Sequence, residues 1–239
     1  IADETEEDAL QTVRSMIRNG LVNSFILLYS KQKDSIIDFL HSEGVLYALI
    51  GKAYQFANQT IYVDTDNIQA GKDATEHLIQ RGHTKIGFIG YEKTLLFSSD
   101  RRYGYELAHL EHGLPIHPDY HITVEHTPNQ LPETLSKLLN YPNRPTAFVV
   151  ADDFLGVALE HYCQQIGLVV PEDISIISFN NSLFAQLALP PITSVDINSI
   201  QLGMEAATQI INHAENSNLA ATKIIIPHQI VEWASCKKL

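Results

Sequence analysis

The chain of 239 residues has little cysteine and no long apolar run. Its two cysteines, Cys163 and Cys236, form neither a CxxC motif nor a spacing typical of a metal site. Two isolated cysteines favour a reducing compartment over a disulfide framework, and we interpret both thiols as structural. A membrane span needs about 20 consecutive apolar residues, and no run reaches that length. We therefore expect a cytoplasmic protein that does not contact a membrane.

Positive charge is also scarce. The chain has 16 Lys and Arg against 28 Asp and Glu, which gives a formal net charge of -12. Non-specific affinity for DNA comes largely from Lys and Arg that neutralise phosphates, so this chain by itself is not expected to bind nucleic acid. Any DNA-binding function has to come from a segment outside these residues.

The motifs of common enzyme classes are missing. The sequence contains no G-x-S-x-G, H-E-x-x-H, Walker A or G-x-G-x-x-G motif. Asp152 and Asp153 resemble a paired carboxylate, but adjacent side chains at the end of an extended strand point apart. General acid–base catalysis needs both groups at one bond. We expect no enzymatic activity, and the sequence implies no cofactor.

Five histidines crowd one stretch of the chain, namely His109, His112, His117, His121 and His126. A zinc site needs convergent ligands, usually with a cysteine or carboxylate at short spacing, and nothing here completes such a set. We therefore expect no metal site, and we place these histidines on a solvated helix face and loop.

Helix and strand patterns alternate almost throughout the sequence. Helices are expected over residues 5–19, 33–42, 68–80, 101–112, 130–140, 153–166 and 198–214. Strands are expected over residues 25–29, 46–50, 60–63, 85–90, 121–125, 146–151, 174–179, 223–226 and 228–233, with a further strand at 192–196 and an irregular stretch at 180–192. Such alternation indicates βαβ units, and the apolar strands lack strict alternation because helices cover both faces. The fold class is therefore α/β.

Polar clusters follow expected strands at four places, with Asp66-Asn67, Arg101, Asp152-Asp153 and Asn180-Asn181. In open parallel sheets, ligands bind outside the carboxyl ends of the strands. Carboxylates, carboxamides and a guanidinium at several strand ends predict one cleft that hydrogen-bonds a hydroxyl-rich small molecule.

The order of short motifs along the chain identifies a family. Residues 66–67, 71, 78–79 and 82–89 resemble the signature "DN…G…LI..GH.KI.FI" of LacI/GalR-type bacterial transcription regulators. Four later segments resemble motifs of the same family in the same order, namely residues 101–105, 145–153, 171–181 and 190–203. Each motif alone is weak, but the series is specific and its spacing covers nearly the whole chain.

The resemblance implies an effector-binding domain with a two-lobed, periplasmic-binding-protein-like fold, in which each lobe is a parallel sheet flanked by helices. We expect the N-terminal lobe to hold residues 1–82 and 197–222, and the C-terminal lobe to hold 83–196 and 223–239. The family begins with a helix-turn-helix DNA-binding domain and a hinge helix, which are absent from this chain. We expect them upstream of residue 1, which falls near the end of the family's second core strand.

The resemblance also implies a function. It predicts the sugar-sensing effector-binding and dimerisation domain of a bacterial transcriptional repressor, a homodimer that binds operator DNA through the headpiece. Many members have Asp in the position of Asn180, and residues 178–182 are similar to maltose-operon repressors of Gram-positive bacteria. The expected effector is therefore maltose or a related glucoside. The alternative is a transport-associated, periplasmic-type sugar-binding protein with the same lobes.

The predicted effector contacts follow from the motifs. Arg101 matches the effector-contacting arginine of the family, and its guanidinium offers forked donors to vicinal hydroxyls; the alternative is a surface arginine at a helix start. Asp66 suits sugar hydroxyls but could instead cap the following helix. Asp152 and Asn180 are predicted contacts on the same grounds.

Four further residues are candidates for the same cleft. Tyr29 and Ser30 come directly after residues 25–28 of an expected strand, while Tyr91 and Phe97 lie in the expected loop before Arg101 and could stack on a pyranose face. The neighbours of the main contacts have other expected roles: Asp153 and Asn181 cap or brace the following turns, and Arg102 is solvated.

Overall fold

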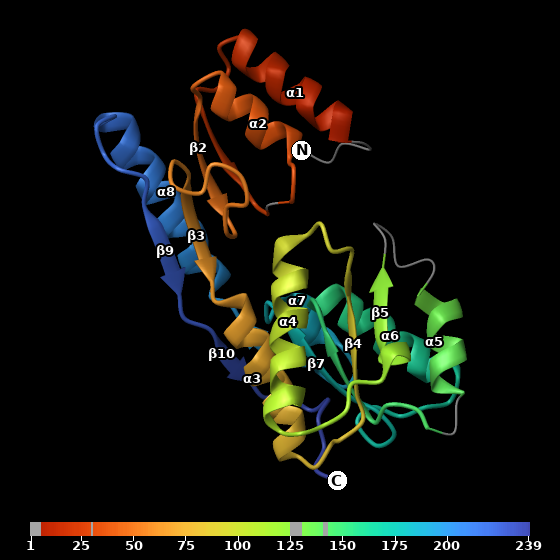
Figure 1. Ribbon diagram of the computed structural model, residues 1–239. Helices are drawn as coiled ribbons and strands as arrows, with labels where there is room; N and C mark the ends of the chain where they lie inside the picture. Colours follow the sequence, from red (N-terminus) through yellow and green to blue (C-terminus); the bar gives the residue numbers. More distant parts are fainter. Residues whose placement is uncertain (1–5, 30, 125–130, 141–142) are drawn as a thin grey trace. The chain divides into compact units, whose positions relative to one another are not determined.

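The computed structural model describes residues 6–29, 31–124, 131–140 and 143–239 (Figure 1). The chain forms two compact units. The first unit consists of Ile1–Asp64, Thr94–Phe97 and Ile200–Ile226, and the second of Thr65–Lys93, Ser98–Ser199 and Pro227–Leu239. The expected lobe boundaries at residues 82, 196 and 222 remain a prediction.

The first unit contains a four-stranded sheet in the order β1-β2-β3-β9. Its strands are β1 (Ser24–Leu27), β2 (Leu46–Ile50), β3 (Ile61–Thr65) and β9 (Lys223–Ile226), and β1, β2 and β3 are parallel. Its helices are α1 (Glu6–Arg18), α2 (Ser35–Ser42) and α8 (Ser199–Glu215). Acidic residues fill the first turn of α1 and Arg18 lies in its last turn, which suits the helix dipole. Val13 of α1 packs in one apolar cluster with Ile37 and Leu40 of α2 and with Leu49 of β2.

The second unit contains a six-stranded sheet in the order β10-β8-β7-β6-β4-β5. Its strands are β4 (Ile86–Tyr91), β5 (His121–Val124), β6 (Ala147–Val150), β7 (Ser175–Phe179), β8 (Thr193–Asp196) and β10 (Gln229–Val231). All pairings are parallel except that of β10 with β8, which is antiparallel. Its helices are α3 (Asn67–Gln80), α4 (Leu96–Glu111), the 3-10 helix η1 (Pro118–Tyr120), α5 (Leu131–Leu139), α6 (Asp153–Gln165) and α7 (Leu183–Leu187).

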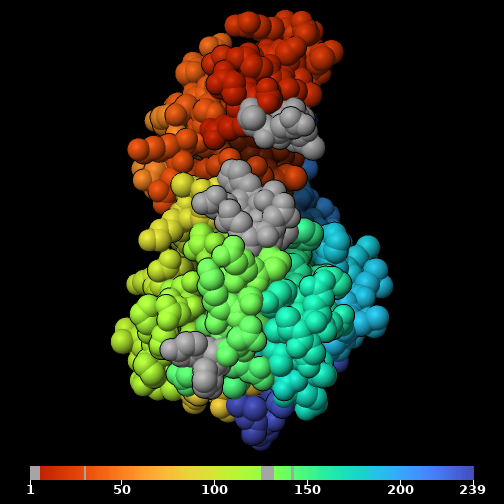
Figure 2. Space-filling model, turned by 90° about the vertical axis from the view of Figure 1, so that its right-hand side faces the viewer, coloured from red at the N-terminus to blue at the C-terminus, as the bar shows by residue number. Residues whose placement is uncertain are grey.

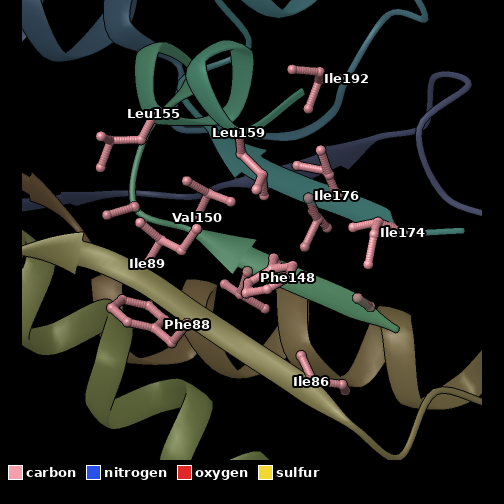
Figure 3. Close-up of a cluster of buried hydrophobic side chains, with 14 of the residues drawn as sticks. Ile86, Phe88, Ile89, Phe148, Val150, Leu155, Leu159, Ile174, Ile176 and Ile192 are labelled. Atoms are coloured by element: carbon pink, nitrogen blue, oxygen red, sulfur yellow. The ribbon is translucent and has the colours of Figure 1, made fainter. Parts of the chain in front are cut away.

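Helices cover both faces of this second sheet. On the face drawn in Figure 2, segments coloured green to cyan form the surface of the second unit, and the end of the chain, in dark blue, reaches that surface. Figure 3 shows α6 on one side of the strands and α3 and α4 on the other. Leu155 and Leu159 of α6 lie over the strands near Val150 and Ile176. Strands buried on both faces explain why β6 has four buried apolar residues in succession.

Most expected elements are present, and the main differences concern α4, α7 and β10. Helix α4 begins at Leu96, five residues before the expected start at Arg101. Helix α7 lies within the stretch expected to be irregular, where the hydroxyl of Ser182 caps it by accepting from the amide of Phe184. The last strand, β10, is short and antiparallel. Within the described residues, no helix is both long and apolar enough to cross a membrane.

Candidate functional site

Arg101 is the buried centre of the predicted site. Its side chain is only 3% exposed and lies within α4, so the alternative of a surface arginine at a helix start is wrong. Its Nε donates to Oδ1 of Asn67 at 2.8 Å, and its Nη1 donates to the carbonyl of Ala151 at 2.6 Å. Its guanidinium carbon lies 4.3 Å from the centre of the Phe179 ring, a cation–π distance. One side chain thus contacts α3 and the carboxyl ends of β6 and β7.

Two glycines bring α3 and α4 close enough for the bond between Arg101 and Asn67. A Cβ on Gly71 would collide with the backbone of Arg101, and a Cβ on Gly104 would collide with the carbonyl of Ile68. Only glycine lets the two helices cross at this separation. The glycines of two sequence motifs therefore have a packing role, which is to set the position of the Arg101 backbone.

Asp66 lies beside Asn67 and caps helix α3, the role that the sequence left open beside sugar binding. Its Oδ1 accepts from the amide of Gln69 at 2.9 Å, which caps α3. The Asp66 residue is exposed, so the carboxylate remains accessible to solvent and to a ligand. No role was predicted for Asn67, although its side chain is the one that accepts from Arg101. Its position next to Asp66 in a family motif is the sequence feature that could have indicated this role.

Asp152 is a half-buried carboxylate with two partners. Its Oδ1 caps α6 by accepting from the amide of Leu155 at 2.8 Å, and its Oδ2 accepts from the hydroxyl of Tyr91 at 2.6 Å. Burial, and secondly the bond to Asp152, raises the pKa of Tyr91 far above its ordinary value. The phenol therefore stays protonated and donates. Tyr91 is the last residue of β4 and not a loop residue.

Asn180 follows β7 in an unusual backbone conformation. It has φ +99° and Asn181 has φ +48°, so two successive non-glycine residues take positive φ. The amide of Asn180 donates to the carbonyl of Val195 at 2.8 Å, and the Asn180 residue is half-buried. Asn181 braces the turn as expected, since its Oδ1 accepts from Nε1 of Trp233 and its carbonyl accepts from Gln186.

The remaining candidates are placed differently. Tyr29 belongs to the first unit, beyond the end of β1, and is 52% exposed. Ser30 lies outside the described residues. Phe97 also belongs to the first unit and lies in the first turn of α4, not in the loop expected before Arg101. The second unit therefore brings together Asp66, Tyr91, Arg101, Asp152 and Asn180.

The five histidines do not share one environment. His109 is buried, with Nδ1 2.9 Å from the carbonyl of Tyr105, so its expected place on a solvated face is wrong. Burial lowers the pKa values of His109 and His121. His126 lies outside the described residues. Among the residues that the structure describes, no group of three or more His, Cys, Asp or Glu is placed to hold a metal ion.

The second unit presents carboxylate, phenol and carboxamide groups at strand ends, and the guanidinium of Arg101 reaches the ends of β6 and β7 from α4. This set suits hydrogen bonding to hydroxyls. The adjacent carboxylates of Asp152 and Asp153 bind different partners: Asp152 accepts from Tyr91, whereas Asp153 accepts from Ser178 and Ser194. They do point apart, as expected from their positions after a strand.

Comparison with known proteins shows the family of this chain. Residues 75–236 match the periplasmic binding protein-like domain family. The HTH-type transcriptional regulator MalR of Staphylococcus xylosus is 31% identical over 223 residues, which are 93% of this chain and 65% of that relative. MalR of Streptococcus pneumoniae TIGR4 is 30% identical over 231 residues, 95% of this chain and 68% of the relative. The chain belongs to the LacI family.

Solved structures of LacI-family members have the same fold. A LacI transcriptional regulator from Bacillus cereus subsp. cytotoxis NVH 391-98 superposes with a TM-score of 0.93 at 35% identity, over 100% of this chain and 85% of that one. The structure described as a probable maltose operon transcriptional repressor malR from Staphylococcus aureus gives 0.89 at 27% identity, over 98% and 83%. This LacI-family chain thus spans about two thirds of the length of its MalR relatives, all of which are transcriptional regulators.

Proposed function

We propose that this chain is the sugar-sensing effector-binding and dimerisation domain of a bacterial transcriptional repressor of maltose or maltodextrin utilisation genes. The observation that carries the proposal is the placement of Arg101. It contacts Asn67, Ala151 and Phe179, and these are the chain neighbours of Asp66, Asp152 and Asn180. The side chain of Arg101 therefore contacts all three segments that carry Asp66, Asp152 and Asn180. The likeness to the structure described as a probable maltose operon transcriptional repressor malR supports maltose as the sugar.

The proposed contacts divide into two groups. Asp66, Arg101, Asp152 and Asn180 bind sugar hydroxyls, because charged and amide groups fix the orientation of a polar ligand. Tyr29, Ser30, Tyr91 and Phe97 stay proposed as further contacts, because an aromatic ring can stack on the apolar face of a pyranose. Since Tyr91 already donates to Asp152, this pair presents a fixed acceptor to the sugar.

The proposed response is a shift between two states of a dimer. A ligand shifts such an equilibrium only by its differential affinity for the two states, and about 1–3 kcal/mol is the usual coupling. One state binds operator DNA through a headpiece outside these residues, and the other releases it. Because DNA is the partner of the whole protein, we place the protein in the cytoplasm.

The second unit has a surface suited to the dimer. Five large apolar side chains on α6, α7 and the turn after it are 47–77% exposed, namely Phe154, Leu183, Phe184, Leu187 and Leu189. Contiguous exposed apolar patches mark interaction sites. A second copy of this chain is the occupant that fits, since helix-turn-helix regulators bind paired half-sites as dimers and the MalR relatives are of this type.

A thermal-shift screen tests the sugar. The panel is maltose, trehalose, sucrose, glucose, ribose, a sugar phosphate and a purine. A ligand at a hundredfold excess over its Kd stabilises the protein by about 2.7 kcal/mol. A shift with maltose supports the proposal, and a shift with a phosphorylated sugar or a purine instead would keep a regulator but replace its effector. No shift with any compound would contradict the proposal.

A further inference from the structure

Asp153 is a buried carboxylate without a role in the proposed sugar contact. It is the first residue of α6 and is 1% exposed. Its Oδ1 accepts from the hydroxyl of Ser178 at 2.5 Å and from that of Ser194 at 2.8 Å. Its Oδ2 accepts from the amide of Ser182 at 2.6 Å. The carboxylate therefore joins the start of α6 to β7, β8 and the turn that precedes α7.

The turn at residues 180–182 is held by three successive backbone amides. The amide of Asn180 donates to the carbonyl of Val195, and that of Ser182 donates to Asp153. Between them, the amide of Asn181 donates to the hydroxyl of Ser194, which itself donates to Asp153. Two of the three amides thus depend on Asp153, one directly and one through Ser194.

This network maintains an unfavourable backbone conformation. Asn180 and Asn181 both take positive φ, a region that non-glycine residues seldom occupy and that persists only when the surroundings fix it. The bonds to Asp153 and Ser194 supply that constraint. Without them the turn keeps the bond from the Asn180 amide to Val195 but loses those of the next two amides, and we expect the direction of the Asn180 side chain to change.

We propose that Asp153 is a positioning residue of the effector site, which fixes the Asn180 turn relative to Asp152. The inference rests on the proposed function for its ligand and deepens it. Asp152 caps α6 while its neighbour Asp153 anchors the turn, so the adjacent carboxylates have complementary tasks. A carboxylate suits Asp153 because three donors converge on its two oxygens. An amide in its place would turn a nitrogen donor toward at least one of them.

A matched pair of serines tests the proposal. Ser194 and Ser235 are both fully buried hydroxyls in the second unit with one donated and one accepted hydrogen bond. Ser235 accepts from the amide of Thr193 and donates to the carbonyl of Ile176, and neither partner belongs to the Asn180 turn. The change to alanine removes the same chemistry from both sites. Ser194→Thr keeps the hydroxyl and serves as the conservative variant.

Two measurements on these variants decide the matter. The first is hydrogen exchange of the Asn181 and Ser182 amides, and the second is the Kd for maltose by titration calorimetry. We expect Ser194→Ala to speed exchange at both amides and to raise the Kd about tenfold, the effect of one buried hydrogen bond. We expect Ser235→Ala to lower the Tm comparably while both readouts stay at the wild-type level, and Ser194→Thr to restore them.

The outcomes separate the two proposals. Equal exchange at these amides in Ser194→Ala and Ser235→Ala would overturn the positioning role, whether or not sugar binds. Faster exchange with an unchanged maltose Kd would also overturn it, because the turn would then not matter to the ligand. If the wild-type protein binds no maltose, the proposed effector fails, and the exchange data still report on Asp153. Ser178→Ala replaces Ser194→Ala if the latter does not fold.

Discussion

The backbone of Gly71 in α3 lies directly against the backbone carbonyl of Arg101 in α4. A Cβ at position 71 would lie closer to that oxygen than any non-bonded contact permits. The Gly71→Ala change must therefore move α4, and with it the guanidinium that binds Asn67 and Ala151. We expect a loss of about 1–3 kcal/mol of unfolding free energy, the usual cost of overpacking.

Gly203 in α8 is the matched control for Gly71. Both are helical glycines, but a Cβ on Gly203 meets nothing within 4 Å. Gly203→Ala should be neutral or stabilise by about 0.5–1 kcal/mol, because alanine is the better helix former. Urea denaturation of both variants measures the difference. Equal stability of the two variants would show that the helices can separate at no cost.

Arg101 and Arg102 are adjacent arginines with different surroundings, and their lysine variants should behave differently. Arg101→Lys keeps the charge but loses the forked geometry that reaches Asn67 and Ala151 together. We expect a loss of about 1–3 kcal/mol in stability, the cost of leaving a buried polar group unpaired. We also expect the sugar-induced thermal shift to disappear.

Arg102→Lys should change neither property. Arg102 pairs with Glu106 one turn later in α4 at 2.8 Å, with both side chains half-buried, and i,i+4 pairs on helices contribute about 0.3–0.5 kcal/mol. Arg101→Ala is a poorer test than the lysine change, because it also removes packing against Phe179. A sugar response that survives in Arg101→Lys would contradict the assignment of Arg101 as an effector contact.

Features that depend on neighbouring residues could be predicted from the sequence. The order of helices and strands follows from local periodicity, and strand β2 has the expected bounds of 46–50. The capping role of Asp66 was also foreseeable, since it needs only the amide of Gln69 three residues away. The family motifs located Arg101, Asp152 and Asn180 but did not indicate which residues these side chains contact.

Features that depend on distant residues could not be predicted in this way. The bond from Arg101 to Ala151 joins residues 50 positions apart, and Asp153 binds Ser194 across 41 positions. Such pairings depend on the order of strands in the sheet, which periodicity does not report. Helix α7 was missed because five residues are too few for a periodic pattern and because its cap at Ser182 is a single residue.

The two cysteines should react slowly in the folded protein. Burial raises the pKa of Cys163 to about 12 and that of Cys236 to about 11. Since only the thiolate reacts, we expect alkylation by iodoacetamide at pH 8 to be at least about a hundredfold slower than in denaturant. Mass spectrometry of quenched time points measures both sites. Rapid alkylation of Cys163 under native conditions would contradict its burial between α6 and the sheet.

Glu160 in α6 should make stability depend on pH. Its side chain is 3% exposed and accepts from the amide of Leu189, while Gln164, one turn later, donates to the carbonyl of the same residue. Among the described residues, Oε1 of Glu160 has no hydrogen-bond partner. Burial raises the pKa of this carboxyl from its ordinary 4.5 to about 7. The folded state thus holds a proton that the unfolded chain releases near pH 4.5.

The sign of the effect follows from this difference in bound protons. Between about pH 4.5 and 7 the folded chain binds more protons than the unfolded chain, so stability is highest at the low end and falls as pH rises. Each pKa unit corresponds to about 1.4 kcal/mol, so the total loss is on the order of 3 kcal/mol. His77, whose pKa burial lowers to about 4, has the opposite slope below its ordinary 6.5.

Glu160→Gln isolates the contribution of Glu160. The amide stays neutral at every pH, and the slope of His77 is common to both proteins and cancels in the difference. We expect the stability of Glu160→Gln relative to wild type to rise steadily between pH 4.5 and 7. Glu133→Gln, at a carboxylate on α5 that is 78% exposed, is the control and should give a flat difference. A flat difference for Glu160→Gln as well would mean that the Glu160 carboxyl is already ionised in the folded protein, despite its burial next to Leu189.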